Sequence, residues 1–244
     1  MTISFRSLFA ATILAGTALT AAPAMAQDSD LTVSANVAYT TDYRFRGVSL
    51  SGGDFALQGG MDVAHASGFY VGTWASSLEE DGGYGSTEVD IYGGWSGALT
   101  ESLSVDVGLL YYLYPDAPDG DYDYLEPYAS VTGAVGPAEV TVGVAYAWEQ
   151  DSLGGDDNLY VYTDLGFGIP ETPVSFSAHL GYTDGVLAPP LLAGSNDETG
   201  FDWSLGASVS AMGLELGVAY VGVEGPSIDG FTDDTIVATL SASF

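Results

Sequence analysis

The last ten residues of the chain alternate between apolar and small polar side chains and end on an aromatic residue. Ile236, Leu240 and Phe244 fall on one face of an extended strand, and Thr239 and Ser241 fall on the other, with one valine as the exception. A period of two that lasts for a whole strand places one face against an apolar medium and the other against a polar one. The segment therefore predicts a strand at the boundary between two media.

The first 26 residues are predicted to be a secretory signal peptide. An arginine precedes a long apolar stretch, and Ala24 and Ala26 give the small-x-small pattern of a cleavage site. The alternative, a transmembrane anchor, is disfavoured because Pro23 interrupts the apolar run and a polar flank follows at once. We therefore expect residues 1–26 to be removed and residues 27–244 to form a single domain.

The same alternation recurs along the rest of the chain. Helical spacing does not fit these segments, because it would distribute their carboxylates over every face of a helix. No later segment has the roughly 18 apolar residues of a membrane-spanning helix, so only strands could cross a bilayer. The twelve predicted strands lie at 31–46, 55–63, 69–77, 88–99, 103–114, 122–135, 139–149, 159–169, 174–183, 201–210, 214–220 and 235–244.

The connections between these strands alternate between short turns and long acidic loops. This alternation, with both ends of the mature chain on the short-turn side, is typical of outer-membrane barrels. Closing the sheet leaves no unpaired strand edge in lipid. We predict an all-β fold: a single antiparallel up-and-down transmembrane β-barrel of about 12 strands. The alternative, a soluble periplasmic sandwich or lipocalin-like barrel, would bury the apolar face and explains the aromatic residues near the strand ends less well.

The charge balance excludes several kinds of partner. Asp and Glu number 33 against three Lys and Arg, giving a net charge of −30, and there is no lysine. Such a surface repels nucleic acid and has no basic patch for anionic lipid head groups. Because 47% of the residues are hydrophobic, disorder is excluded as well. The absence of cysteine removes disulfides and thiolate metal sites.

The first half of the predicted domain carries a set of distinctive motifs. They are Asp42-Tyr-Arg-Phe-Arg-Gly47, Gln58-Gly-Gly60 with Asp62, Gly68-Phe-Tyr70, Gly72-Thr-Trp74, Glu88-Val-Asp-Ile-Tyr-Gly93, the segment 109–115 and Tyr124-Leu-Glu-Pro-Tyr128. In these motifs the chain resembles the TorF family of porins, earlier catalogued as conserved proteobacterial proteins of unknown function. The chain departs from that pattern at Leu50, where the resemblance leads us to expect glutamine. The resemblance implies an outer-membrane barrel in a Gram-negative bacterium.

The polar faces of the predicted strands supply the candidate lumen residues. The side chains predicted to line the lumen are Asp42, Arg44, Arg46, Asp62, Glu88, Asp90, Asp106, Glu139, Glu149, Asp164, His179, Asp202 and Glu215. Arg44 and Arg46 are the only basic side chains after the signal peptide, and we expect both on the inward face of the first strand. Either they brace the barrel by bridging several carboxylates, or they form a constriction that orients a solute.

The predicted lumen is narrow and acidic. Twelve strands lie between the roughly eight of a filled barrel and the roughly sixteen of an open porin. The inward carboxylates favour cations or neutral solutes over anions. We therefore expect passive diffusion of small cationic or neutral solutes. The alternative is a closed structural or surface-interaction barrel. The oligomeric state is left open.

Neither an enzyme nor a built metal site is predicted. His65 and His179 are the only histidines, no Gly-x-Ser-x-Gly elbow is present, and no zinc spacing is found. The acids between 116 and 123 do not match the calcium loop of an EF-hand. We hypothesise instead that Mg²⁺ or Ca²⁺ bridges the acidic rim to the lipid of the outer leaflet. No cofactor is predicted.

The longest loop, 184–200, contains an apolar run from Val186 to Leu192. It either folds inward as a constriction, caps the rim or contacts a partner. We favour packing against the barrel mouth, because an exposed apolar run is unfavourable in water.

Overall fold

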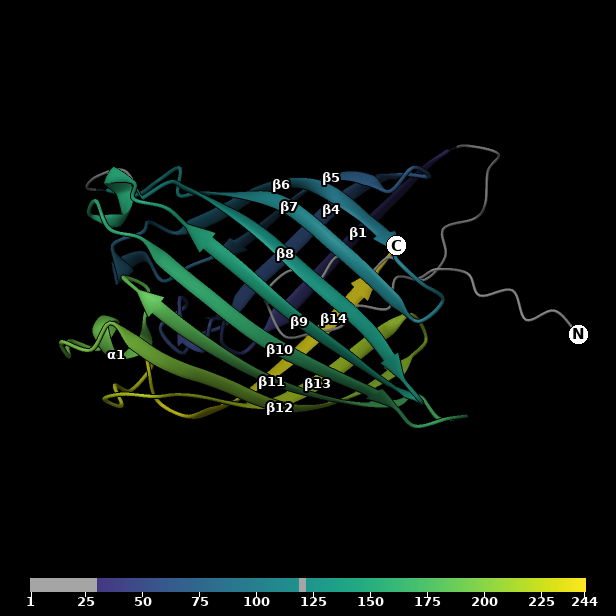
Figure 1. Ribbon diagram of the computed structural model, residues 1–244. Coiled ribbons are helices and arrows are strands. Elements are labelled where there is room, and N and C mark those ends of the chain that lie inside the picture. The colour runs from purple at the N-terminus through teal and green to yellow at the C-terminus, as the bar shows by residue number, and fades with distance from the viewer. Residues whose placement is uncertain (1–29, 119–121) are drawn as a thin grey trace, which may run out of the picture.

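Twelve antiparallel strands close into one barrel in the computed structural model, which describes residues 30–118 and 122–244 (Figure 1). Each strand pairs with its neighbours in the chain, and the first and last strands, β1 and β14, pair to close the ring. The predicted fold class is confirmed. The predicted signal peptide, 1–26, lies outside the described residues. Within the described residues, no helix is long and apolar enough to span a bilayer.

The barrel strands have the following bounds. They are β1 (Leu31–Thr40), β4 (Ala56–His65), β5 (Phe69–Ser77), β6 (Thr87–Ala98), β7 (Leu103–Leu113), β8 (Tyr124–Val135), β9 (Ala138–Ala147), β10 (Asn158–Gly168), β11 (Val174–Gly185), β12 (Thr199–Ala211), β13 (Leu214–Val223) and β14 (Thr235–Ser243). Two further short strands, β2 (Arg44–Phe45) and β3 (Val48–Ser49), pair only with each other. Within the described ranges, the loops carry two 3₁₀ turns, at Glu80–Gly82 and Asp151–Leu153, and one short helix, α1 (Pro189–Leu192).

The outward face of the barrel is apolar and the inward face is polar or aromatic. Leu57, Leu205 and Ile236 are 59%, 64% and 67% exposed, whereas the inward Tyr112 and Tyr160 are almost fully buried. A soluble domain would reverse this distribution, while a barrel in hydrocarbon requires it. The final strand follows the predicted alternation. The backbone of Phe244 exchanges hydrogen bonds with that of Ala35 on β1, at 2.8 and 3.1 Å.

Outward aromatic residues gather near both ends of the strands. At the end with the long loops, the ring of Tyr39 stacks on that of Phe55 with centroids 5.0 Å apart. At the other end, Phe69, Phe176 and Phe244 are exposed. Such paired belts mark the two interfaces of a membrane barrel.

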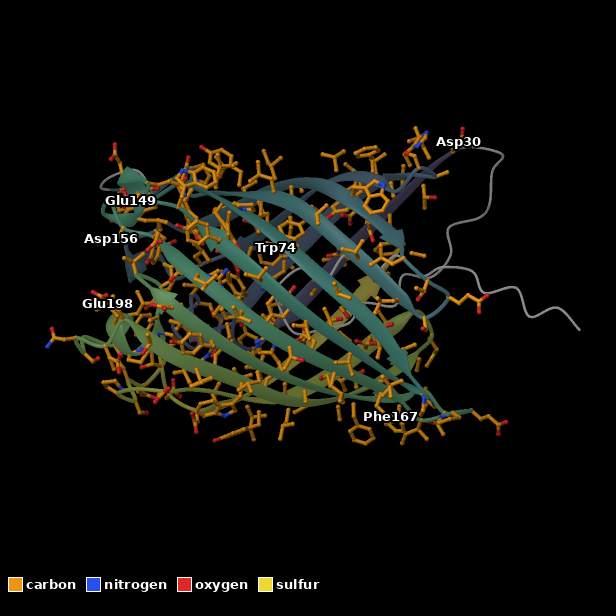
Figure 2. The ribbon with its side chains drawn as sticks, viewed as in Figure 1. Asp30, Trp74, Glu149, Asp156, Phe167 and Glu198 are labelled. Carbon is orange, nitrogen blue, oxygen red and sulfur yellow. The ribbon has the colours of Figure 1, made fainter. Side chains whose placement is uncertain are left out.

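The two rims of the barrel differ. Figure 2 shows Glu149, Asp156 and Glu198 at the rim of long loops, and Asp30, just before β1, near the opposite rim of short turns. The C-terminus lies at the short-turn rim as well (Figure 1).

The loop 184–200 covers part of the mouth at the long-loop rim. Ala188, Pro189 and Pro190 are buried, and Pro190 packs against Gly200 and Gly225. This placement agrees with the predicted packing against the barrel mouth.

Candidate functional site: the barrel lumen

The segment 41–54 folds into the barrel, and we call it the lumen hairpin. β1 ends at Thr40, and Phe45 pairs with Val48 across a two-residue turn. Both turn residues, Arg46 (φ 47) and Gly47 (φ 79), adopt left-handed conformations. This is the pattern of a tight type I′ hairpin, in which the first position favours Asn, Asp or Gly rather than arginine.

Contacts with strands around the ring show that the lumen hairpin crosses the interior. Tyr43 packs edge-on against Trp74 of β5, and Phe45 packs edge-on against Tyr112 of β7. A Cβ on Gly47 would overlap Val223 of β13. Because it contacts strands on different sides of the barrel, the hairpin occupies the half of the lumen nearer the long loops.

The prediction that Arg44 and Arg46 lie on the first strand is wrong. Both lie on the lumen hairpin, beyond the end of β1. Tyr43, which would face outward if the first strand continued to residue 46 as predicted, is buried inside. The physical reason is that a hairpin strand and a continuing barrel strand share the same two-residue period.

Arg46 forms a buried ion pair across the lumen. Its Nη2 atom lies 2.7 Å from both carboxylate oxygens of Glu126 on β8, and each side chain is 1% exposed. The Tyr112 hydroxyl donates to the same carboxylate at 3.1 Å. The guanidinium also lies over the rings of Tyr160, at 4.2 Å, and Phe45, at 4.8 Å. Its Nε and Nη1 atoms have no hydrogen-bond partner among the described residues.

Arg44 ties the hairpin to the loop that precedes β14. Its guanidinium contacts Asp42 at 2.5 Å and Asp233 at 3.0 Å, and it donates to the carbonyl oxygens of Phe231 and Asp233. Ser49 and Ser51 donate to Asp42 from within the hairpin. A cavity of about 380 Å³ lies between hairpin and loop, lined by residues that include Asp42, Arg44 and Asp233. This cavity is polar and charged.

Two further acids are buried beside the hairpin on β6. Glu88 is 0% and Asp90 is 3% exposed. Tyr43 lies beside Glu88, and Asp90 Oδ1 has no hydrogen-bond partner among the described residues. The register places Trp74 and Tyr112 on either side of Asp90. Carboxylates that are buried this deeply need a neutralising proton or cation.

His179 connects three neighbouring strands. Its Nδ1 lies 2.6 Å from Asp164 on β10, and its Nε2 lies 3.0 Å from Asp202 on β12. The Tyr160 hydroxyl is 2.8 Å from the same Nε2. The imidazole therefore sits between two carboxylates, where a charged ring would be stabilised.

The half of the lumen nearer the short turns is lined by acids that tyrosines cover. Tyr92 donates to Asp62 at 2.5 Å, and Tyr70 donates to Asp106 at 2.6 Å. The hydroxyls of Tyr70 and Tyr128 are themselves 2.5 Å apart. Within the described residues, no group of three or more His, Asp or Glu is arranged to hold a metal ion.

Residues 24–244 match the sequence model of a family described as "Bacterial protein of unknown function (Gcw_chp)". The chain belongs to this family. No curated protein matches it. The Gcw_chp chain shares its fold with solved porins, among them the NanC porin (12% identity, 87% of this chain and 99% of that chain, TM-score 0.57).

Two other solved structures are similar. The KdgM porin, in complex with disordered oligogalacturonate, is 8% identical over 86% of this chain and 98% of its own, with a TM-score of 0.57. The COG4313 outer membrane channel from Pseudomonas putida F1 is 11% identical over 89% and 96%, with a TM-score of 0.54. At these identities the likeness shows the fold, a twelve-stranded porin-like barrel.

The structure distributes the predicted lumen residues over three regions. The hairpin carries Asp42, Arg44 and Arg46; inward strand positions carry Asp62, Glu88, Asp90, Asp106, Asp164, His179 and Asp202; and the short-turn ends of β9 and β13 carry Glu139 and Glu215. The prediction for Glu149 is wrong. It was predicted to face inward on a strand, but β9 ends at Ala147, so Glu149 lies exposed in the following loop (Figure 2).

Sequence reasoning missed Glu126, the partner of Arg46. Its segment, 122–135, is predicted to be a strand, but the alternation did not establish which of its side chains face inward. The signal that could have found it is the spacing of Tyr124, Glu126 and Tyr128, which places all three on one face.

Proposed function

We propose that the Gcw_chp chain is an outer-membrane porin through which small cationic or neutral solutes diffuse passively. Residues 27–244 would form the barrel once the signal peptide 1–26 is removed. The observation that carries the proposal is a closed twelve-stranded barrel with an apolar outer face and an inward face of acids, tyrosines and small polar residues. The porin fold of its neighbours and the resemblance to the TorF family support it. They also favour transport over an enzymatic role.

The inward charges support selectivity for cations. Asp62 and Asp106 lie in the half of the lumen that the hairpin does not fill, and the basic side chains of the described lumen are held by carboxylates elsewhere. Fixed negative charge in a narrow path raises the local concentration of cations and lowers that of anions. An acidic lumen would repel a polyanion such as the oligogalacturonate in the KdgM complex, so fold similarity carries no substrate over to this chain.

Conductance in a planar bilayer tests the proposal directly. We expect discrete steps, with a reversal potential in a KCl gradient that shows preference for K⁺. The D62N/D106N variant should reduce that preference, whereas the D156N/E198Q variant, with equal charge loss at the exposed rim, should change it less. A reversal potential dominated by Cl⁻ would refute cation selectivity, and recovery of the folded protein from the periplasmic fraction would refute the location.

A closed structural or surface-interaction barrel is the second candidate. It is favoured by one observation: the lumen hairpin and its neighbours Tyr112, Glu126 and Tyr160 are almost fully buried in the half nearer the long loops. Electrical silence of the folded protein, together with equal solute uptake in a deletion strain and its parent, would select this function.

We also propose that divalent cations bind along the acidic rim. The chain has no lysine, and both arginines of the described residues are engaged inside the barrel. Mg²⁺ or Ca²⁺ would then bridge rim carboxylates to lipid phosphates. EDTA should lower the melting temperature of the protein in outer-membrane lipid and leave it unchanged in neutral detergent. Equal melting temperatures with and without EDTA in both media would contradict this.

A further inference from the structure

Negative charge exceeds positive charge in the buried half of the lumen. Glu88 and Asp90 are two residues apart on the inward face of β6, and the charges of Glu88 and Glu126 both act on Asp90. Among these three acids, Arg46 binds Glu126. The remaining two are buried, and Asp90 Oδ1 accepts no hydrogen bond from the described residues. Buried carboxylates are strongly unfavourable unless a proton or a cation neutralises them.

The walls around these two acids are aromatic. Trp74, Tyr112 and Tyr124 are each at most 6% exposed, and the rings of Tyr112 and Tyr124 stack with centroids 4.4 Å apart. Tyr43 of the lumen hairpin covers Trp74 and Glu88. We call Glu88, Asp90, Trp74, Tyr112 and Tyr124 the acidic aromatic box. Carboxylates beside aromatic faces are the surroundings in which proteins recognise organic cations.

Arg46 provides an internal example of this recognition. Its guanidinium combines a carboxylate, Glu126, with two aromatic faces, those of Tyr160 and Phe45. It reaches this place from a turn position with φ 47, a conformation that a side chain larger than Asn or Asp rarely adopts. The turn therefore places a cation next to the acidic aromatic box, and its left-handed backbone motivates a functional hypothesis for this position.

We propose that the acidic aromatic box binds an organic cation bearing a guanidinium or primary ammonium group, with Arg46 as its built-in competitor. The cation enters from the long-loop rim when the hairpin moves aside, and its charged group pairs with Glu88 and Asp90. Arg46 weakens this binding because it adds positive charge next to the site. The inference deepens the proposed function, on which it rests, by naming the class of solute that the lumen recognises. A metal ion is served less well, since the described residues offer no three-ligand cluster.

Calorimetry on the folded protein in detergent, with agmatine as the probe, tests the site without requiring conduction. Agmatine carries both a guanidinium and an ammonium group, and butylurea serves as a neutral comparison. We expect agmatine but not butylurea to bind, and we expect E88Q/D90N to abolish binding. The D156N/E198Q variant also loses two negative charges, but at exposed rim positions, and should bind agmatine as the parent does.

The R46Q variant should bind agmatine on the order of tenfold more tightly, because the competing charge is gone and the Glu126 carboxylate is left without its cation. Folding of each variant is checked by the gel shift between boiled and unboiled samples. If R46Q does not fold, the comparison of the parent with E88Q/D90N decides. Equal agmatine affinity in the parent and E88Q/D90N would overturn the proposal, as would absence of binding in both the parent and R46Q, or binding of Mg²⁺ alone at these acids. Binding to a barrel that never conducts would support the site and refute the porin; conduction without binding would refute the site alone.

Discussion

Replacing Glu126 with glutamine should release the lumen hairpin. The variant leaves the guanidinium of Arg46 in a place where both partners are 1% exposed and where its Nε and Nη1 atoms already have no partner among the described residues. Removing one member of a buried ion pair typically costs about 3–5 kcal/mol. Because the hairpin can move out and return Arg46 to water, this cost should appear as opening of the hairpin rather than as unfolding of the barrel.

Trypsin reports this opening with unusual selectivity. It cleaves after Lys and Arg, and the chain beyond residue 26 contains only Arg44 and Arg46, both on the hairpin. When opening and closing are fast relative to cleavage, the cleavage rate follows the population of the open form. A loss of about 3 kcal/mol should therefore raise the rate about 100-fold, since each 1.4 kcal/mol corresponds to a factor of ten.

The R46Q/E126Q double variant provides the matched comparison. It removes both charges, leaves no unpaired ion and keeps Arg44 as a cleavage site, so its cleavage after Arg44 should be slower than that of E126Q. E198Q, at an exposed rim position, should behave as the parent. The reasoning is refuted if E126Q is cut at a rate within about threefold of the parent while the gel shift shows a folded barrel.

Three further outcomes are expected. In G47A the new Cβ would overlap Val223, and the alanine backbone would have to keep a strained φ of 79. Trypsin should therefore cut the hairpin faster than in the parent, whereas G154A, which has a similar φ but open space around the new Cβ, should be cut more slowly than G47A. Equal cleavage rates in the two variants would mean that the close approach of Gly47 to Val223 is unimportant. Deleting Phe244 leaves the backbone groups of Ala35 unpaired at the closing seam, so the folded fraction on gels should fall, and an unchanged fraction would count against this role. The Ser86 hydroxyl and amide, which donate to Asp116, hold the pKa of that exposed carboxyl below its usual value. The contact is therefore fully formed at pH values above the ordinary pKa of an aspartate and is lost as pH falls through the lowered pKa of Asp116. S86A should raise the pKa of Asp116 in a carboxyl NMR titration. An identical titration curve in S86A and the parent would contradict the assignment.

The barrel follows from the sequence because facing is a local property of a strand. Ile236 and Leu240 point outward and Ser241 points inward, as the alternation in the last ten residues predicts. Twelve such segments, with alternating loop lengths, leave closure as the way to pair every edge in lipid. No knowledge of distant contacts is needed for this step.

The contents of the lumen depend on contacts between distant residues, and these could not be predicted. The pairing of Arg46 with Glu126 joins residues 80 positions apart, and the contact of Arg44 with Asp233 joins residues 189 apart. The alternation through Tyr43 and Phe45 is equally compatible with a continuing strand. Gly47 is the local cue to the turn, but Arg46 before it disfavours the φ that the turn requires, so the dipeptide does not predict a hairpin.

The abundance of glycine and tyrosine has a cause that composition alone concealed. Many tyrosines lie inside the barrel, among them Tyr92, Tyr112 and Tyr160. There the ring of an inward tyrosine lies across an inward glycine of the paired strand, as Tyr92 does over Gly72 and Tyr128 over Gly108. A side chain at either glycine would overlap the ring.

Under the proposed porin function, this pairing affects where the path through the barrel is narrowest. Each glycine lets a tyrosine ring lie against the backbone of the paired strand. Nearer the long loops, Tyr112 and Tyr124 stack on each other, and the hairpin fills what remains. Under the proposed porin function, we expect the main resistance to a solute between the hairpin and the acidic aromatic box. Substitutions there should control conductance, and substitutions among the covered acids of the opposite half should control charge preference.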